Sequence, residues 1–272
     1  MAPFAHAPKQ GRGGHDDMLT VYEHNESVCC QKVRLVLAEK AIAHTTINIS
    51  FEERQQHTPE FLALNPKGCV PVIVHDGRVV TESTIITEYL DDAFAGPTLM
   101  PKEPYWRARR RLWARWIDEE MHIPHISTIS FNISFTEHLK YKEGIHDQGP
   151  RGAPPPFFFV GLQSEAMLAS LKAYQRFLAE MDRTLADQKW LAGPEFSLAD
   201  IDVIPYVWRL KNLQLQGLWH KMPRIQDWLD RVSSRRSFRR MIIETALPDW
   251  LGSMRENGER AWPAVKEMLE LA

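Results

Sequence analysis

The fold is decided by the stretch VPVIVHDGRVVTES, residues 70–83. Two short runs rich in β-branched residues, 70–74 and 78–81, flank the pair Asp76-Gly77. An Asp-Gly pair between two such runs is typical of a β-hairpin turn. A helical pattern follows to about Phe94, and we expect Ser83 to cap it. The stretch therefore predicts an antiparallel hairpin that leads directly into a helix.

Working outward toward the amino terminus, the pattern alternates between strand and helix. Residues 19–22 and 45–49 read as strands, residues 27–40 have a helical period, and Thr58-Pro59 starts another helix. The predicted order is β-α-β-α-β-β-α. A βαβ unit followed by a hairpin and a closing helix is an α/β, thioredoxin-like arrangement with a mixed sheet covered on both faces. We assign it to residues 18–95 and expect residues 1–17 to be a disordered leader.

Beyond this domain the periodicity is helical almost throughout. Pro97, Pro101 and Pro104 mark a linker, after which residues 104–272 predict an all-α carboxy-terminal domain. A Gly- and Pro-rich insertion interrupts this domain near residues 142–161. The expected helices span residues 105–121, 164–186, 197–212, 224–233 and 262–271.

Composition narrows the choice of function and compartment. The formal charge is −2, from 33 basic and 35 acidic residues, which gives no electrostatic reason to expect nucleic acid. No apolar run has the ~18 residues that a membrane span needs. The chain has 3 cysteines, of which Cys29 and Cys30 are adjacent. We therefore expect a reducing, cytoplasmic location with chemical rather than structural cysteines.

The first helix begins where several reactive side chains gather, at Ser27-Val28-Cys29-Cys30. A helix amino terminus carries a partial positive charge and free N–H groups, which favour a thiolate. Ser27 could donate a hydrogen bond to a bound thiol and so activate it. Cys29 or Cys30 could instead be the nucleophile, forming a mixed disulfide. A capping serine with two buried cysteines is the structural alternative.

Two further segments suit the binding of a small peptide. Val70-Pro71 opens a strand, and a cis Pro there would leave the Val70 backbone free to pair with an extended peptide. Glu82-Ser83 precedes a helix, where Glu82 can accept from an ammonium and Ser83 can hold a carboxylate. Together they would bind an α-amino acid. An ordinary trans Pro and a plain helix start are the alternatives.

In order and spacing, these segments resemble the cytosolic glutathione transferase superfamily. The resemblance is carried by residues 27–40, 65–72 and 80–86, and by Trp190-Leu191-Ala192-Gly193 followed by Ser197-Leu198-Ala199-Asp200. It implies glutathione as co-substrate and a dimer, either a homodimer or a heterodimer with a related chain. It also places His57 and Lys67 within reach of the glycine carboxylate of glutathione. The Ser-x-x-Asp pair we interpret as a helix cap.

Residues 75–90 are similar to bacterial β-etherases, which cleave aryl ethers of lignin fragments. This similarity implies attack of the glutathione thiolate on a carbon next to a ketone, with release of a phenol. A hydrophobic aromatic electrophile would meet aromatic side chains of the helical domain, with Phe131, Phe135, Phe157, Phe158, Phe159, Trp106, Trp113 and Trp208 as candidates.

The cysteine pair favours a different reaction. Where Cys29 and Cys30 stand, the β-etherases have Asn and Ser, and residues 27–32 resemble the tetrachlorohydroquinone dehalogenases instead. That resemblance makes Cys29 catalytic, in reductive dehalogenation or thiol transfer. A transferase-fold adaptor protein without turnover is the third hypothesis.

Two other sequence patterns are interpreted without assigning them a chemical role. His122 and His125 are spaced like metal ligands, but Pro124 lies between them and no third ligand is indicated, so we predict no metal site. The basic run of Arg107, Arg109, Arg110, Arg111 and Arg115 predicts a solvated helix face or a dimer contact. The apolar side of the same helix is expected to hold Trp106, Leu112, Trp113, Trp116 and Ile117.

Overall fold

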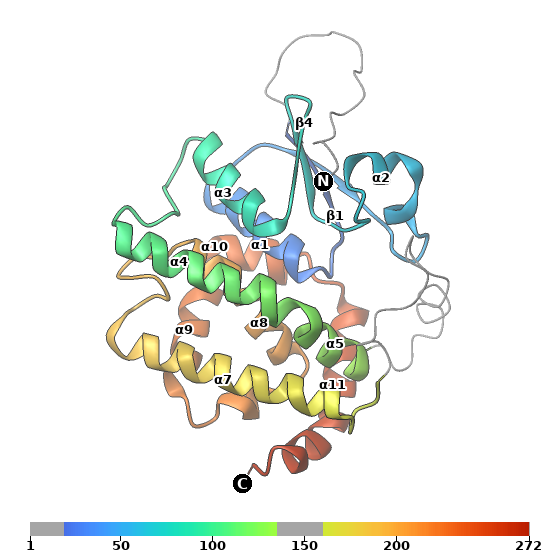
Figure 1. The fold of residues 1–272 in the computed structure, drawn as a ribbon, viewed down its shortest axis with the longest axis vertical. Helices are drawn as coiled ribbons and strands as arrows, with labels where there is room; N and C mark the ends of the chain where they lie inside the picture. Colours follow the sequence, from blue (N-terminus) through green and yellow to red (C-terminus); the bar gives the residue numbers. More distant parts are fainter. Residues whose placement is uncertain (1–18, 135–159, 272) are drawn as a thin grey trace.

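The computed structural model describes residues 19–134 and 160–271. Figure 1 shows a small sheet with its helices (blue to cyan) above a larger helical part (green to red). The predicted leader and most of the insertion at 142–161 lie outside the described residues. The predicted fold class, a thioredoxin-like part followed by an all-helical part, is confirmed.

The amino-terminal part is built on a four-stranded mixed sheet. Its strands are β1 (Leu19–Glu23), β2 (Thr45–Asn48), β3 (Val72–His75) and β4 (Arg78–Thr81), in the order β2-β1-β3-β4. β1 is parallel to β2 and antiparallel to β3, and β3 and β4 form the predicted hairpin. The parallel pair needs a crossover connection, which α1 (Val28–Glu39) supplies.

Helices cover both faces of the sheet because the strand residues alternate in direction. Leu19 and Val21 point into a large core that includes residues of α1 and α3 (Ser83–Ala93). On the opposite face, Tyr22 and Val72 pack with Phe61 of α2 (Pro59–Leu64), which follows the short helix η1 (Gln55–His57). The sheet is thus a layer between α1 and α3 on one side and α2 on the other.

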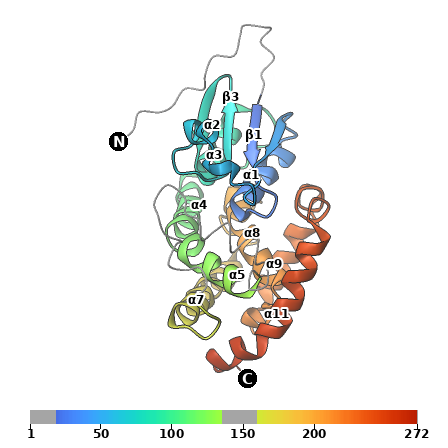
Figure 2. The same ribbon diagram turned by 90° about the vertical axis from the view of Figure 1, so that its right-hand side faces the viewer.

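The helical part packs around a central, almost fully buried helix, α8 (Leu198–Asn212). The other elements are α4 (Pro104–Trp116), the π-helical segment η2 (Ile117–Ile126), α5 (Ser127–Ile133), α7 (Glu165–Asp187), η3 (Gln216–Trp219), α9 (Pro223–Ser233), α10 (Arg236–Phe238), η4 (Arg239–Ile243) and α11 (Pro248–Met268). In Figure 2, α11 runs along one side of this part and reaches up toward α1. Within the described ranges, no helix is long and apolar enough to cross a membrane.

The predicted cap of α8 is confirmed. The Ser197 side chain accepts from the helix backbone while Asp200 accepts from the Ser197 backbone, the reciprocal pair of a capping box. Asp200 also accepts from Trp228 Nε1 at 2.8 Å and from the Leu191 amide at 3.1 Å. Burial raises the pKa of Asp200 to about 6 against these hydrogen bonds. The motif therefore connects three separate segments of the core.

Several predicted helix boundaries were wrong. Ser83 is the first residue of α3, and Glu82, with a positive φ of 69°, occupies the cap position. The helix expected to run to about 121 is α-helical to Trp116 and continues as the π-helical segment η2, whose regular pattern breaks at Ile123 (φ −124°, ψ 125°) and Pro124. The last helix starts at Pro248 rather than at 262. Its buried face includes Asn257 and Gly258, so no apolar period was visible there.

Two assignments on α4 were also wrong. Arg110 does not belong to a solvated face: its side chain is only 1% exposed and is ion-paired with Glu88 and with the buried Asp202. Leu112, expected on the apolar side, is 57% exposed. The guanidinium takes a core position because two carboxylates neutralise it, a pairing that helical periodicity does not reveal.

The packing of α11 against the end of α8 gives a testable stability prediction. A Cβ added at Gly258 would lie 2.0 Å from the Leu213 carbonyl oxygen, whereas at Gly252, on the same helix, it would meet nothing within 4 Å. We expect Gly258→Ala to lower the free energy of unfolding by about 3 kcal/mol, because backbone atoms must move apart.

The matched variant Gly252→Ala should leave stability unchanged or raise it by about 0.5–1 kcal/mol, since alanine favours helix over glycine. Urea unfolding followed by circular dichroism measures both changes. Equal effects of the two substitutions would show that α11 does not pack against α8 as described.

Candidate active site at the start of helix α1

The register of the sheet brings three chain segments to one end of the sheet. Tyr22 pairs with Val72, and Val72 pairs with Thr81. The loop that follows β1, the Val70-Pro71 segment before β3, and Glu82-Ser83 after β4 therefore lie next to one another. These are the three segments in which the sequence predicted chemistry.

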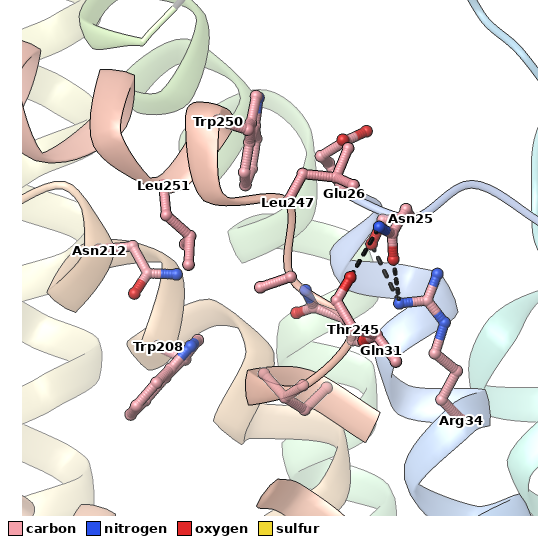
Figure 3. Close-up of a pocket in the computed structure, with 12 residues that line it drawn as sticks. Asn25, Glu26, Gln31, Arg34, Trp208, Asn212, Thr245, Leu247, Trp250 and Leu251 are labelled. Carbon is pink, nitrogen blue, oxygen red and sulfur yellow. Dashed lines mark hydrogen bonds between the residues drawn. The ribbon is translucent and has the colours of Figure 1, made fainter. Parts of the chain in front are cut away.

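The loop between β1 and α1 is held from both parts of the protein. Arg34 donates to the backbone oxygens of His24 and Asn25 and to Asn25 Oδ1, at 3.0–3.3 Å. Asn25 in turn donates to the Thr245 carbonyl at 2.9 Å (Figure 3). Arg209 of α8 donates to the Glu26 carbonyl and stacks on Trp250 of α11. These contacts fix where α1 begins.

Ser27 and Cys30 have structural positions at this helix start. The Ser27 hydroxyl accepts from the Cys30 amide at 3.3 Å and so acts as the helix cap. The Cys30 thiol is fully buried, and burial raises its pKa to about 12. The His24 amide donates to its sulfur at 3.4 Å. Cys30 is therefore a protonated, packed thiol at neutral pH.

Cys29 faces the other way, toward the helical part. Its Sγ lies 3.6 Å from Nε2 and 3.8 Å from Nδ1 of His122, and 3.8 Å from the Tyr206 hydroxyl. Its side chain is half-buried. The half-buried thiol thus stands at the junction of α1, η2 and α8.

The electrostatic surroundings of Cys29 favour the thiolate. Burial raises the pKa of Cys29, but the charge and hydrogen bond of His122, the nearby Lys32 ammonium and a hydrogen bond from Ser83 outweigh it and lower the pKa to about 6. Burial acts to lower the pKa of His122, yet the Cys29 thiolate raises it overall, with Asp118 contributing. The two side chains therefore form a thiolate–imidazolium pair at neutral pH.

A second layer of charge lies beneath this pair. Lys32, one turn along α1 from Cys29, has a fully buried side chain whose Nζ is 3.3 Å from Asp118 Oδ1. Asp118 also accepts a short hydrogen bond from the Thr84 hydroxyl of α3. Burial raises the pKa of Tyr206, so its phenol keeps its proton and can donate toward the thiolate. Asp118 thus ties α1, η2 and α3 together at the site.

The Val70-Pro71 segment, where the sequence predicts peptide binding, lies beside the start of α3. The Val70-Pro71 bond is cis. Over the described residues, no intramolecular hydrogen bond is formed by the Val70 N–H or carbonyl. Beside it, the N–H groups in the first turn of α3, from Ser83 onward, have no partner within the described part of the chain. Ser83 itself bonds to Cys29. Backbone groups of these two segments thus lie close to the Cys29 thiol.

Lys67 and Glu82 form an ion pair, and His57 takes no part in it. Lys67 Nζ lies 2.6 Å from Glu82 Oε1, and both side chains are more than half exposed. His57 packs under Gly68, and its buried Nδ1 has no hydrogen-bond partner among the residues that the structure describes. Burial lowers the pKa of His57. Lys67 is therefore tied to the residue before α3, while His57 supports the loop that carries Lys67.

The predicted aromatic candidates are spread through the helical part. Trp113 is buried in the core, and Trp106 packs on Gly193. Trp208 contacts Phe238 and lines a separate recess with Trp250 (Figure 3). This recess has a cavity volume of about 20 Å³, room for about one water molecule, so it does not fit an aromatic substrate. Phe135 and 157–159 lie outside the described residues.

Three side chains of the site were not identified from the sequence: Lys32, Asp118 and Tyr206. The histidine pair was noticed only for its metal-like spacing. In the structure His122 faces Cys29, whereas His125 contacts Ser170 Oγ at 3.2 Å. The described residues contain no group of three or more His, Cys, Asp or Glu suited to a metal. The sequence signal that could have indicated Lys32 was its position one helical turn after Cys29.

Comparison with known families identifies two domains in the chain. Residues 26–93 match the family model for the glutathione S-transferase amino-terminal domain. Residues 164–231 match the model for the glutathione S-transferase carboxy-terminal domain. Together the two matches cover half of the chain.

Similar proteins span nearly its whole described length. Protein LigF of Sphingobium sp. is 29% identical over 88% of this chain and 98% of its own length. The crystal structure of β-etherase LigF superimposes with a TM-score of 0.69, at 28% identity over 83% of this chain and 99% of that chain. Glutathione S-transferase GstB of Escherichia coli is 27% identical over 83% of this chain and 98% of its own length. A stringent starvation protein A homolog of Haemophilus influenzae is 25% identical over 84% of this chain and 92% of its own length.

The two adjacent cysteines should differ sharply in reactivity. In a Cys69→Ser background, we expect iodoacetamide to alkylate Cys29 with a rate that rises around pH 6 and is level by pH 7.5, because the thiolate is the nucleophile. Cys30, whose pKa is raised to about 12, should stay unmodified in the folded protein.

Peptide mapping by mass spectrometry identifies the modified cysteine at each pH. His122→Gln should move the midpoint for Cys29 upward by more than one pH unit, because the imidazolium charge is lost. A midpoint above pH 8 in the unaltered protein would contradict the ion pair.

Proposed function

Since this chain belongs to the glutathione S-transferase family, with glutathione as co-substrate, we propose that Cys29 carries its reaction. The enzyme removes the glutathionyl group from a glutathione conjugate and passes it to a second glutathione. The observation behind the proposal is the contact between Cys29 Sγ and the His122 ring at 3.6 Å, at the start of α1. Glutathione is expected along Val70 and Ser83, with its sulfur next to Cys29.

Charge at the helix start favours this reaction over simple activation of glutathione. Two thiolates about 4 Å apart would repel each other by about 4 kcal/mol at an effective dielectric constant of ~20. The low pKa of Cys29 makes it the thiolate that occupies the site in the free enzyme. A glutathione sulfur arriving there is then more readily attacked than ionised. Ser27, already used as the helix cap, is not required as an activator.

The proposed reaction has two steps that balance. The Cys29 thiolate attacks the sulfur of a conjugate X–SG, a Cys29–glutathione disulfide forms, and the electron pair of the broken X–S bond leaves with X, which takes up a proton. A second glutathione thiolate then attacks the glutathionyl sulfur, which yields glutathione disulfide and restores the Cys29 thiolate. Overall, X–SG and one glutathione give X–H and glutathione disulfide.

The similarity to LigF supports an aromatic ketone as the group X. Cleavage of a β-aryl ether by glutathione gives a thioether at the carbon next to a ketone. A ketone accepts the electron pair of the broken C–S bond as an enolate, so such a thioether can release its sulfur to Cys29. A thioether without the ketone has no comparable leaving group.

β-Aryl ether cleavage is the second candidate, on the strength of the same similarity. Here bound glutathione would attack the ether carbon and release a phenol, with the Ser27 hydroxyl or the helix start stabilising its thiolate. Cys29 would then have to be protonated when glutathione is bound. Under this alternative, Cys29→Ser should keep most of the activity.

One set of assays separates the candidates. We expect the enzyme to convert an α-glutathionyl acetophenone and glutathione to acetophenone and glutathione disulfide, and Cys29→Ser to lower the rate at least ~10³-fold because the nucleophile is lost. Cys30→Ser, the matched control, should stay within a few-fold. Product analysis by liquid chromatography and mass spectrometry measures each.

The same preparations are given glutathione and a β-aryl-ether ketone. Phenol release without turnover of the thioether would contradict the thiol-transfer proposal and favour ether cleavage. Failure to bind glutathione and to turn over either substrate would favour a non-catalytic adaptor.

We also propose a cytoplasmic homodimer, with a related chain as the alternative partner. Ile85 of α3, Tyr105 and Leu112 of α4 are large apolar side chains that are 56–58% exposed. Burying such side chains stabilises an interface. Leu112→Glu should therefore convert a dimer to monomers in sedimentation velocity, while a monomeric unaltered protein would contradict the proposal.

A further inference from the structure

The His122 ring faces the Cys29 sulfur with both of its nitrogens at hydrogen-bond distance. Nε2 and Nδ1 lie at nearly equal distances from Sγ, 3.6 and 3.8 Å. His24, His44, His75 and His220 instead each have one ring nitrogen 2.7–2.9 Å from an oxygen. In the part of the chain described, Cys29 is the one hydrogen-bond partner of the His122 ring. The imidazolium therefore keeps an N–H group that can donate to a bound substrate.

The ring is held in place by groups other than the thiol. Ile123 departs from helical geometry, which ends the regular turn at His122. Ser127 Oγ donates to the His122 carbonyl at 3.2 Å. The Tyr206 ring meets the imidazole edge-on, with centroids 6.0 Å apart and planes at 90°. His122 is thus positioned by its own segment and by α8, so it can lose its bond to the sulfur without losing its place.

Of the charged groups around the site, His122 does most to stabilise the Cys29 thiolate. Cys29 and Lys32 face it from α1, Asp118 from its own segment and the Tyr206 hydroxyl from α8. The Lys32 ammonium is already paired with Asp118. His122 is accordingly the cation in direct contact with the Cys29 sulfur, and its charge becomes available when the thiolate is consumed in a disulfide.

We propose that His122 is a catalytic proton donor, which protonates the carbon released when Cys29 takes the glutathionyl sulfur. This inference rests on the proposed thiol transfer at Cys29. Once the thiolate has attacked, the imidazolium has lost its anionic partner at Cys29, so its proton is available to an enolate that leaves within reach of the ring. An enolate is a much stronger base than a thiolate, so a positioned acid accelerates its departure.

The same residue closes the proton balance of the cycle. After donating, His122 is neutral and faces a Cys29–glutathione disulfide. It can then accept the thiol proton of the second glutathione, whose thiolate attacks the disulfide. Over one cycle, one proton enters on the second glutathione and one proton leaves on the product carbon. The enzyme therefore returns to the thiolate–imidazolium pair with no net gain or loss of protons.

The test uses the full-length enzyme with an α-glutathionyl propiophenone and glutathione in deuterium oxide at pD 7. Protonation by a fixed donor delivers deuterium to one face of the enolate, so the unaltered enzyme should give the α-deuterated ketone as mainly one enantiomer. His122→Gln should lower turnover about 10²-fold or more. It should also give a racemic deuterated ketone, because the enolate then takes its deuteron from solvent.

His125→Gln, three residues further along and in contact with Ser170, is the matched control and should keep both rate and stereochemistry. A purely structural role for His122 would lower the rate but leave one enantiomer in excess, and that result overturns the inference. Mass spectrometry of the stopped reaction detects the Cys29–glutathione disulfide. If the unaltered enzyme forms neither this disulfide nor glutathione disulfide, the proposed function fails as well.

Discussion

The contact between the Cys29 thiolate and the His122 imidazolium is the interaction on which the rest of the site depends. Each partner is half-buried, and each charge is sustained by the other against the cost of burial. The start of α1 adds its own positive end, which favours the anion. Cys29 comes from the sheet part and His122 from the helical part, so neither part has the site alone. The reaction is therefore tied to how the two parts pack.

That packing rests on buried charges as much as on apolar contacts. Lys32 reaches from α1 to Asp118, and Arg110 of α4 pairs with Asp202 of α8 and Glu88 of α3. Farther along α1, Glu39 accepts from Arg235 at 2.7 and 2.8 Å, and Lys40 pairs with Asp91. Removing one partner of a buried pair leaves an uncompensated charge, which is costly. These pairs hold α1 in a fixed orientation, and with it the direction in which Cys29 points.

The sequence was sufficient to predict the sheet, because strand alternation and the Asp76-Gly77 turn are local signals. It also singled out Ser27, Cys29 and Cys30, but it left open which of them reacts. The difference between their surroundings depends on partners distant in the chain: His122 is 93 positions from Cys29 and Tyr206 is 177 positions away. Arg110 and α11 were misjudged for a related reason. Their buried faces contain charged, polar or small residues whose partners lie on other helices, so hydrophobic periodicity could not reveal them.

The central claim is that Cys29 and His122 exist as an ion pair in the resting enzyme. Its most direct test is nitrogen-15 NMR of histidine-labelled protein, with His122 assigned from the His122→Gln spectrum. At pH 7.5 the account predicts that both ring nitrogens of His122 are protonated, and that Cys29→Ser makes the ring neutral at the same pH. A neutral His122 ring in the unaltered protein, or a charged ring that persists in Cys29→Ser, would contradict it.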